Sequence, residues 1–160
     1  NIPVIAAGGI HDRYDIKKNL EMGCLAVQMG TRFLATYESG ASLEYKKKLV
    51  ECNEDDIVLA DNPGSPCGLL FRVLKQSPFY QEALNQERTP NCNKGYVLID
   101  GKCKAKDGLG SFCICNGLLS SSDHEDNEKP LYSVGARAWE INEITSVESL
   151  MQELTAPVCL

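Results

Sequence analysis

Two apolar segments that each run into glycine constrain the fold of this chain more than any other feature. The first covers residues 3–10 (PVIAAGGI) and the second covers residues 25–34 (LAVQMGTRFL). Continuous apolar runs of this kind are typical of parallel strands that are covered on both faces. Between them, Asp12 is a good N-cap for a helix that we expect to reach about Met22. The pattern predicts an α/β fold in which the two strands are parallel neighbours.

The glycines at the carboxyl ends of both segments predict a phosphate site. In a (β/α)₈ barrel, the loops after the last two strands often build such a site together. Glycine suits this role because backbone N–H groups can then approach a phosphate closely. The alternative is that Gly8, Gly9 and Gly30 only form tight turns or serve packing at the strand–helix junctions.

The length and charge of the chain exclude several classes of protein. The 160 residues suffice for one domain with a core, but a complete eightfold barrel typically needs roughly 250. Because the chain starts inside a strand pattern, we expect the C-terminal part of a longer protein, the alternative being a complete small domain. A net charge of −6 without a basic cluster argues against a nucleic-acid partner. We also expect no membrane partner, since no apolar run approaches the roughly 20 residues of a membrane span.

Seven of the eight cysteines of the chain fall into a dispersed set and a clustered set, and the eighth, Cys159, stands next to the C-terminal residue. Cys24, Cys52 and Cys67 lie in or beside apolar patterns and fit thiols of a cytoplasmic protein. The clustered set is Cys92, Cys103, Cys113 and Cys115. Structural zinc sites usually pair their ligands roughly two to four residues apart, a spacing that this set lacks. We therefore predict no metal site, while the sequence leaves metal binding by these four cysteines open.

The pattern changes twice along the chain and divides it into three parts. Residues 1–55 are expected to form the last two strand–helix units of a barrel, with a helix over 42–52. Residues 56–130 are interpreted as an irregular, cysteine-rich excursion, with a strand over 57–60 and short helices over 68–75 and 79–87. Residues 131–160 are interpreted as a closing segment that packs on the barrel.

The final helix has a recognisable start signal, which predicts a start at Thr145 or Ser146. Thr145 and Glu148 fit the capping box, in which the hydroxyl and the carboxylate satisfy each other's backbone donors. Pro157 is expected to end this helix.

The glycine-bearing segments resemble a known family of flavin enzymes. Residues 3–10, then residues 26–36 (AVQMGTRFLAT) with Glu38-Ser39, resemble the nitronate monooxygenase family, also called 2-nitropropane dioxygenase. Flavin-dependent enoyl-acyl-carrier-protein reductases share this signature. Residues 112–115 (FCIC) and 131–154 are similar to later segments of the family. The resemblance implies a (β/α)₈ TIM barrel that holds FMN, with the two segments as its seventh and eighth strands and a mostly helical, irregular extension after them.

The resemblance also implies roles for particular residues. Those implied to hold the FMN phosphate are Ala7, Gly8, Gly9, Gly30 and Thr31. Gln28 is implied to lie on the flavin side of its strand end. The catalytic histidine of the family comes from earlier strands, and no residue here matches it, so no catalytic residue is assigned. His11 is interpreted as a polar loop histidine, because no nucleophile or acid stands at a spacing typical of a triad.

Three functions remain open on the sequence. The resemblance implies an FMN-dependent oxidoreductase that acts on a small molecule and oxidises alkyl nitronates with O₂. The same phosphate cradle would serve an FMN-dependent enoyl-acyl-carrier-protein reductase, so the sequence does not separate these two enzymes. The third hypothesis is a non-catalytic partial barrel that self-associates. On its own, this chain is expected to be inactive and to form a homo-oligomer, because an open strand edge favours pairing with a second copy.

Overall fold

The computed structural model describes residues 2–61, 70–85, 100–102, 117, 120–121 and 129–158. The chain forms two compact units, one made of Asn1–Glu54 with Gly135–Leu160 and the other of Asp55–Val134. The divisions therefore fall after Glu54 and Val134, whereas the sequence analysis placed them after residues 55 and 130. Within the described residues, no helix has both the length and the apolar character needed to cross a membrane.

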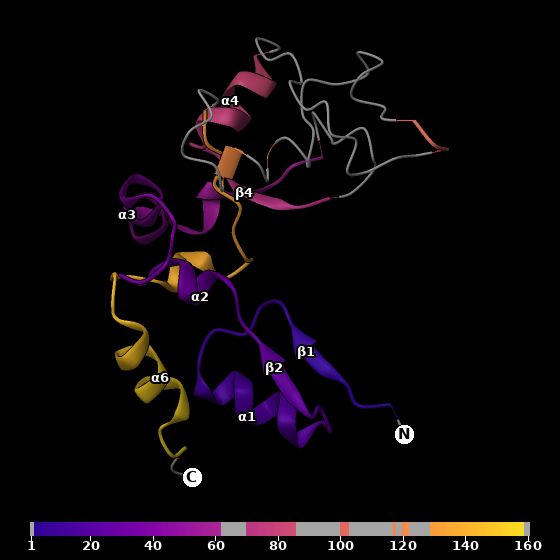
Figure 1. Cartoon of the computed structure of the whole chain (residues 1–160), viewed down its shortest axis with the longest axis vertical. Coiled ribbons are helices and arrows are strands. Elements are labelled where there is room, and N and C mark those ends of the chain that lie inside the picture. The colour runs from indigo at the N-terminus through magenta and orange to yellow at the C-terminus, as the bar shows by residue number, and fades with distance from the viewer. Residues whose placement is uncertain are drawn as a thin grey trace. The chain divides into compact units, whose positions relative to one another are not determined.

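The first unit is built on a parallel pair of strands. Strand β1 (Ile5–Ala7) pairs with β2 (Ala26–Gln28), and Ile5 stands opposite Ala26 while Ala7 stands opposite Gln28. Helix α1 (Arg13–Glu21) connects the strands and contacts β2, as Figure 1 shows. The strand–helix–strand unit expected from the sequence is therefore present, although both strands are shorter than the apolar runs that predicted them.

Local signals at both ends of α1 explain its length. The side chain of Asp12 accepts the N–H groups of Tyr14 and Asp15, and the carboxylate of Asp15 accepts the N–H of Asp12 in return. This capping box satisfies donors that the first helical turn leaves without partners. At the other end, Gly23 has φ +97°, a left-handed conformation that glycine adopts without steric cost and that stops the helix.

The rest of the first unit consists of short helices and the C-terminal helix. Helices α2 (Thr31–Leu34) and α3 (Leu43–Glu51) follow β2, and Ser42 caps α3 through the N–H of Tyr45. The 3-10 helix η3 (Ala138–Glu140) contacts α3. Helix α6 (Val147–Thr155) contacts α1.

Of the two predicted starts of α6, the structure has Ser146, so the capping box predicted for Thr145 and Glu148 does not form. The N-cap is Ser146, whose hydroxyl accepts the N–H of Ser149 at 3.0 Å. Glu148 therefore occupies the second helical position and cannot reach back as the box requires. The N–H of Val147 instead donates to Glu38, a residue far away in the sequence. The carboxylate of Glu38, which is distant in the sequence, thus accepts a hydrogen bond at the start of α6 in place of the Glu148 carboxylate.

The second unit contains an antiparallel hairpin and a helix. Strand β3 (Ile57–Leu59) follows the 3-10 helix η1 (Glu54–Asp56) and pairs with β4 (Arg72–Leu74). Helix α4 (Pro78–Leu84) follows with proline in its first turn. The buried residues at the centre of this unit are Ala60, Val73, Phe79, Tyr80, Ala83 and Leu131.

The helix predicted over residues 68–75 is wrong, because Arg72–Leu74 forms strand β4. Its backbone pairs with β3 on one side, and on the other Val73 forms a bridge with Ser133. Val73 is also fully buried. These pairings come from segments far apart in the sequence, and such tertiary contacts override weak local propensity.

Several sequence predictions lie outside the described residues. They include much of the cysteine-rich excursion predicted over residues 56–130, and Cys67 with the four clustered cysteines. Of the described cysteines, Cys24 is partly buried, and Cys52 is buried with its thiol donating to the carbonyl oxygen of Leu49 at 3.1 Å. The described residues contain no cluster of three or more histidine, cysteine, aspartate or glutamate side chains able to hold a metal ion.

Candidate phosphate site

The register of β1 and β2 brings the glycine turns together. Ala7 and Gln28 are paired at the carboxyl ends of parallel strands, so the residues that follow them emerge at the same edge of the sheet. After β1, Gly8 and Gly9 take φ values of +84° and +70°. Only glycine adopts this left-handed region routinely, so the backbone itself requires these two residues.

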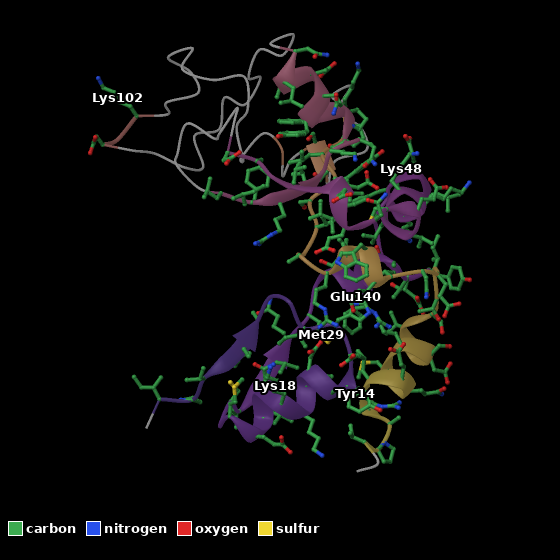
Figure 2. All side chains as sticks on the ribbon, turned by 180° about the vertical axis from the view of Figure 1, so that it is seen from behind. Tyr14, Lys18, Met29, Lys48, Lys102 and Glu140 are labelled. Atoms are coloured by element: carbon green, nitrogen blue, oxygen red, sulfur yellow. The ribbon has the colours of Figure 1, made fainter. Side chains whose placement is uncertain are left out.

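A small cavity of about 70 Å³ lies at this edge. Of the residues predicted to hold FMN, all except Ala7 line it, and Ala7 is the last residue of β1 just before it. Gln28 ends β2 on the opposite strand. Figure 2 labels Met29, another lining residue, immediately after β2. The lining residues are Gly8, Gly9, Ile10, His11, Gln28, Met29, Gly30, Thr31, Arg32, Gly135, Ala136, Arg137, Ala138 and Ile141.

Packing does not require glycine at positions 8, 9 and 30 of this cavity. A Cβ atom built on Gly8, Gly9 or Gly30 would meet no atom within 4 Å. Gly30 has a φ of −111°, which other residues also adopt. Neither backbone strain nor a neighbouring side chain therefore accounts for glycine at position 30. The space in front of Gly30 is open. A site at which the backbone must approach a ligand closely requires such open space.

The far wall of the cavity comes from the C-terminal part of the chain. The N–H of Gly135 donates to the hydroxyl of Thr31 at 2.9 Å. A Cβ atom on Gly135 would lie 3.0 Å from that same hydroxyl oxygen, so glycine is needed here for close packing. Thr31 therefore joins the β2 end to the 135–141 segment, and its hydroxyl proton remains available as a donor.

Arg137 forms the centre of a charged network beside the cavity. Its guanidinium donates to the carboxylates of Glu140 and Asp15, and to the carbonyl oxygen of Gly9 at 3.3 Å. The hydrogen bond from Arg137 holds the pKa of Glu140 below its usual value, despite burial. Burial raises the pKa of Asp15, but hydrogen bonds from the backbone of His11 and Asp12 and from Arg137 outweigh it and leave this pKa lowered.

Arg32 makes an equivalent contact from the β2 side. Its guanidinium donates to the carbonyl oxygen of His11 at 3.0 Å and to the carboxylate of Glu153 at 2.6 Å. Partial burial lowers the pKa of His11, and the positive charges of Arg32 and Arg137 add to this effect. His11 is therefore a neutral imidazole near pH 7. It also lines a second, polar cavity of about 210 Å³ together with Arg32, Glu140 and Glu153.

The geometry favours a small anionic group held by backbone donors. Helix α2 begins at Thr31, and the first N–H groups of a helix have no partner within it. Both arginines are neutralised by carboxylates, so they contribute little net positive charge. The cavity of about 70 Å³ is far smaller than the roughly 300–1,000 Å³ of pockets that hold a whole ligand of drug size. It therefore has room for a small group rather than for a whole cofactor.

Sequence reasoning missed the wall formed by residues 135–141. That segment was interpreted only as closing the barrel, and Arg137 was not singled out. Gly135-Ala136 is the one local signal, because a small-residue pair after an apolar run is compatible with close backbone approach. Arg137 itself gives no signal, since its partners Asp15 and Gly9 lie 122 and 128 residues earlier.

Comparison with known proteins agrees with these observations. The family model "Nitronate monooxygenase" matches residues 1–157. A probable nitronate monooxygenase from Staphylococcus saprophyticus is 46% identical over 61 residues, which are 38% of this chain and 17% of that protein. The nitronate monooxygenase from Pseudomonas aeruginosa is 49% identical over 49 residues, or 31% of this chain and 14% of that protein.

The similarity to solved structures extends over most of the chain. FabK from Thermotoga maritima superposes with a TM-score of 0.65 at 31% identity, covering 96% of this chain and 43% of that one. Nitroalkane oxidase from Streptomyces ansochromogenes gives 0.58 at 24% identity, covering 98% of this chain and 39% of that one, which supports the fold alone. This chain thus spans less than half of each protein that it matches.

Proposed function

Because the chain belongs to the nitronate monooxygenase family, we propose that it supplies the phosphate cradle of an FMN-dependent oxidoreductase that oxidises alkyl nitronates with O₂. The observation that carries this proposal is that Gly8, Gly9 and Gly30 line one small cavity at the carboxyl ends of the two paired strands. Neither the φ angle of Gly30 nor any neighbouring atom within 4 Å requires glycine there. A phosphate in the adjoining cavity accounts for both the glycine and the open space.

The residues of the cavity fit this group. Backbone N–H groups at Gly9, Gly30 and Thr31 are the proposed donors, with the Thr31 hydroxyl beside them. Gln28 is proposed to lie on the flavin side of the strand end. In the parent enzyme, this arrangement would form part of a (β/α)₈ barrel in which β1 and β2 are the seventh and eighth strands. Bound FMN would supply the redox chemistry, taking an electron from the nitronate before O₂ completes the oxidation.

A second candidate activity is FMN-dependent reduction of an enoyl thioester by the enoyl-acyl-carrier-protein reductase reaction. The match to FabK over 96% of this chain favours keeping it. Both activities need the same phosphate cradle, so the cradle does not discriminate between them. An anaerobic assay of the full-length protein discriminates between the two activities. We expect alkyl nitronates to reduce the flavin, and reduction only by NAD(P)H with an enoyl thioester as acceptor would favour the second activity.

The cradle is tested by flavin affinity in the full-length protein. We expect Gly30→Val to weaken FMN binding at least tenfold, or about 1.4 kcal/mol, because the side chain would fill the space in front of the backbone. The matched control is Gly40→Val, since a Cβ atom at Gly40 also meets nothing within 4 Å but Gly40 does not line the cavity. Unchanged affinity for FMN in a fluorescence titration of Gly30→Val would remove Gly30 from the site.

We further propose that residues 1–160 alone do not turn over substrate. No residue in the chain matches the catalytic histidine that the family resemblance implies. Turnover of an alkyl nitronate by this chain, above a control with free FMN at the same concentration, would contradict the proposal. A yellow, flavin-bound preparation without turnover would agree with a chain that holds the cofactor but lacks the catalytic group.

A further inference from the structure

The turn after β1 is held from outside by a set of charged contacts. We call residues 8–12 the Gly8–Asp12 turn. Arg137 donates to the carbonyl oxygen of Gly9 at 3.3 Å, inside this turn. The same guanidinium nitrogen also donates to the carboxylate of Asp15. The other edge of the guanidinium is occupied by Glu140, through two hydrogen bonds.

Asp15 carries the contact further along the turn. The carboxylate oxygen of Asp15 that meets Arg137 also accepts the N–H of His11 at 2.8 Å and that of Asp12 at 3.3 Å. One arginine and one carboxylate thus bind a carbonyl and two N–H groups of the turn. Arg32 binds a further carbonyl, that of His11, at 3.0 Å.

The Gly8–Asp12 turn does not stabilise its own backbone conformation. Two successive residues, Gly8 and Gly9, have positive φ values and no neighbouring atom within 4 Å of their Cβ positions. Glycine has the largest backbone freedom of any residue, so ordering two of them costs more conformational entropy than ordering other residues. Nothing packs on them to offset that cost, so the polar contacts from Arg137, Asp15 and Arg32 must do so.

Arg137 is poorly placed to bind a phosphate by charge. Its positive charge faces two carboxylates, and the group of Arg137, Asp15 and Glu140 has a net negative charge when all three are ionised. The guanidinium of Arg137 also donates hydrogen bonds to Glu140, Asp15 and Gly9. Its contribution must therefore come through the backbone that it holds.

We infer that Arg137 is a positioning residue that, through Asp15 and the carbonyl of Gly9, fixes the Gly8–Asp12 turn in the conformation that receives the FMN phosphate. This inference rests on the proposed function for the identity of the ligand. A turn ordered before binding avoids the entropic cost of ordering at the moment of binding, which raises affinity. The gain applies only to a ligand whose phosphate reaches the turn.

The test compares FMN with riboflavin, which has the same ring system without the phosphate. In the full-length protein we expect Arg137→Met to weaken FMN binding about tenfold and to leave riboflavin binding unchanged. The control variant Lys18→Met removes a positive charge from α1, away from the cavity, and should change neither affinity. An equal loss for FMN and riboflavin would overturn the inference in favour of a general effect on folding, and no loss for either would overturn it outright.

A second measurement does not depend on flavin. In the ligand-free protein, the amides of His11 and Asp12 are hydrogen-bonded to Asp15, so their hydrogen exchange reports on the turn. We expect Arg137→Met to speed their exchange about tenfold while leaving the amides of α3 unchanged. Unchanged exchange at His11 and Asp12 would overturn the positioning role. A wild-type protein that does not prefer FMN to riboflavin would instead refute the proposed phosphate site.

Discussion

The carboxylate of Glu38 accepts the backbone N–H of Val147 with both oxygens, each at 3.0 Å. The two residues are 109 positions apart in the sequence. Val147 is the first residue of α6, so its N–H has no partner within the helix. A carboxylate at this point also interacts favourably with the positive end of the helix dipole. Glu38 therefore fixes where the C-terminal helix begins.

Glu38→Ala is expected to lower the free energy of unfolding by about 1 kcal/mol, the usual effect of losing a helix cap. Glu38→Gln keeps an acceptor oxygen and loses the charge, so it should lower the stability by less. Urea unfolding followed by circular dichroism measures both. Equal stability of the alanine variant and the wild type would show that Ser146 alone suffices as the cap.

The two kinds of glycine at the cavity should respond differently to alanine. Gly9 has φ +70°, and a side chain in the left-handed region costs roughly 1–2 kcal/mol. Gly30 has φ −111° and open space in front of it, so Gly30→Ala should change the stability by less than about 0.5 kcal/mol. Thermal unfolding of the two variants checks this contrast. A Gly30→Ala loss as large as that of Gly9→Ala would mean that glycine 30 serves the fold.

Acidification should destabilise the first unit in two stages. Burial and the nearby arginines lower the pKa of His11, so below the ordinary value of about 6.5 the unfolded chain binds a proton that the folded chain resists. The free energy of unfolding therefore decreases as the pH is lowered through this first window. The pKa values of Asp15 and Glu140 are lowered too, so their contributions are complete near neutral pH and are lost below about 4.

Unfolding midpoints in urea between about pH 2 and pH 8 measure this dependence. His11→Gln should remove the first stage and leave the second, because glutamine does not titrate. A wild-type profile that is flat between pH 5 and pH 7 would contradict the lowered pKa of His11.

Local signals predicted those parts of the structure that depend on neighbouring residues. The Asp12 cap of α1, the end of α1 near Met22 and the start of α3 at Ser42 each depend on residues within a few positions. The cavity residues Gly8, Gly9 and Gly30 were also predicted, because glycines at the ends of two parallel strands must emerge at one edge.

The misses share one physical cause, which is long-range pairing. Strand β4 forms because its backbone finds β3 and Ser133, neither of which lies in its local window. The α6 cap depends on Glu38, and the role of Arg137 depends on Asp15 and Gly9. Neither the periodicity of apolar residues nor the spacing of a local motif predicts such distant partners. The family resemblance supplied the expected cofactor and the strand-end residues of its proposed site, but not the wall that contains Arg137.

The exposed apolar residues in and beside the β1–β2 pair should make residues 1–160 associate when produced alone. Ile5 is 58% exposed and Leu25 is 69% exposed. In the described part of the chain, the sheet that contains β1 has only two strands. Strands in parallel sheets normally have both faces covered, and an open edge is a template for pairing. A second copy can cover this edge with the same surface, which closes the assembly as a dimer.

Sedimentation velocity at micromolar concentration tests this prediction, and we expect a dimer or larger species. Ile5→Lys places a charge on the exposed strand, which natural proteins use to block edge pairing, so it should shift the population toward monomer. Leu43→Lys is the matched control, because Leu43 is 62% exposed on α3, outside the sheet, and should leave the association unchanged. A folded monomer in the wild-type chain would mean that water solvates β1 without a partner, and the expected self-association would then be wrong.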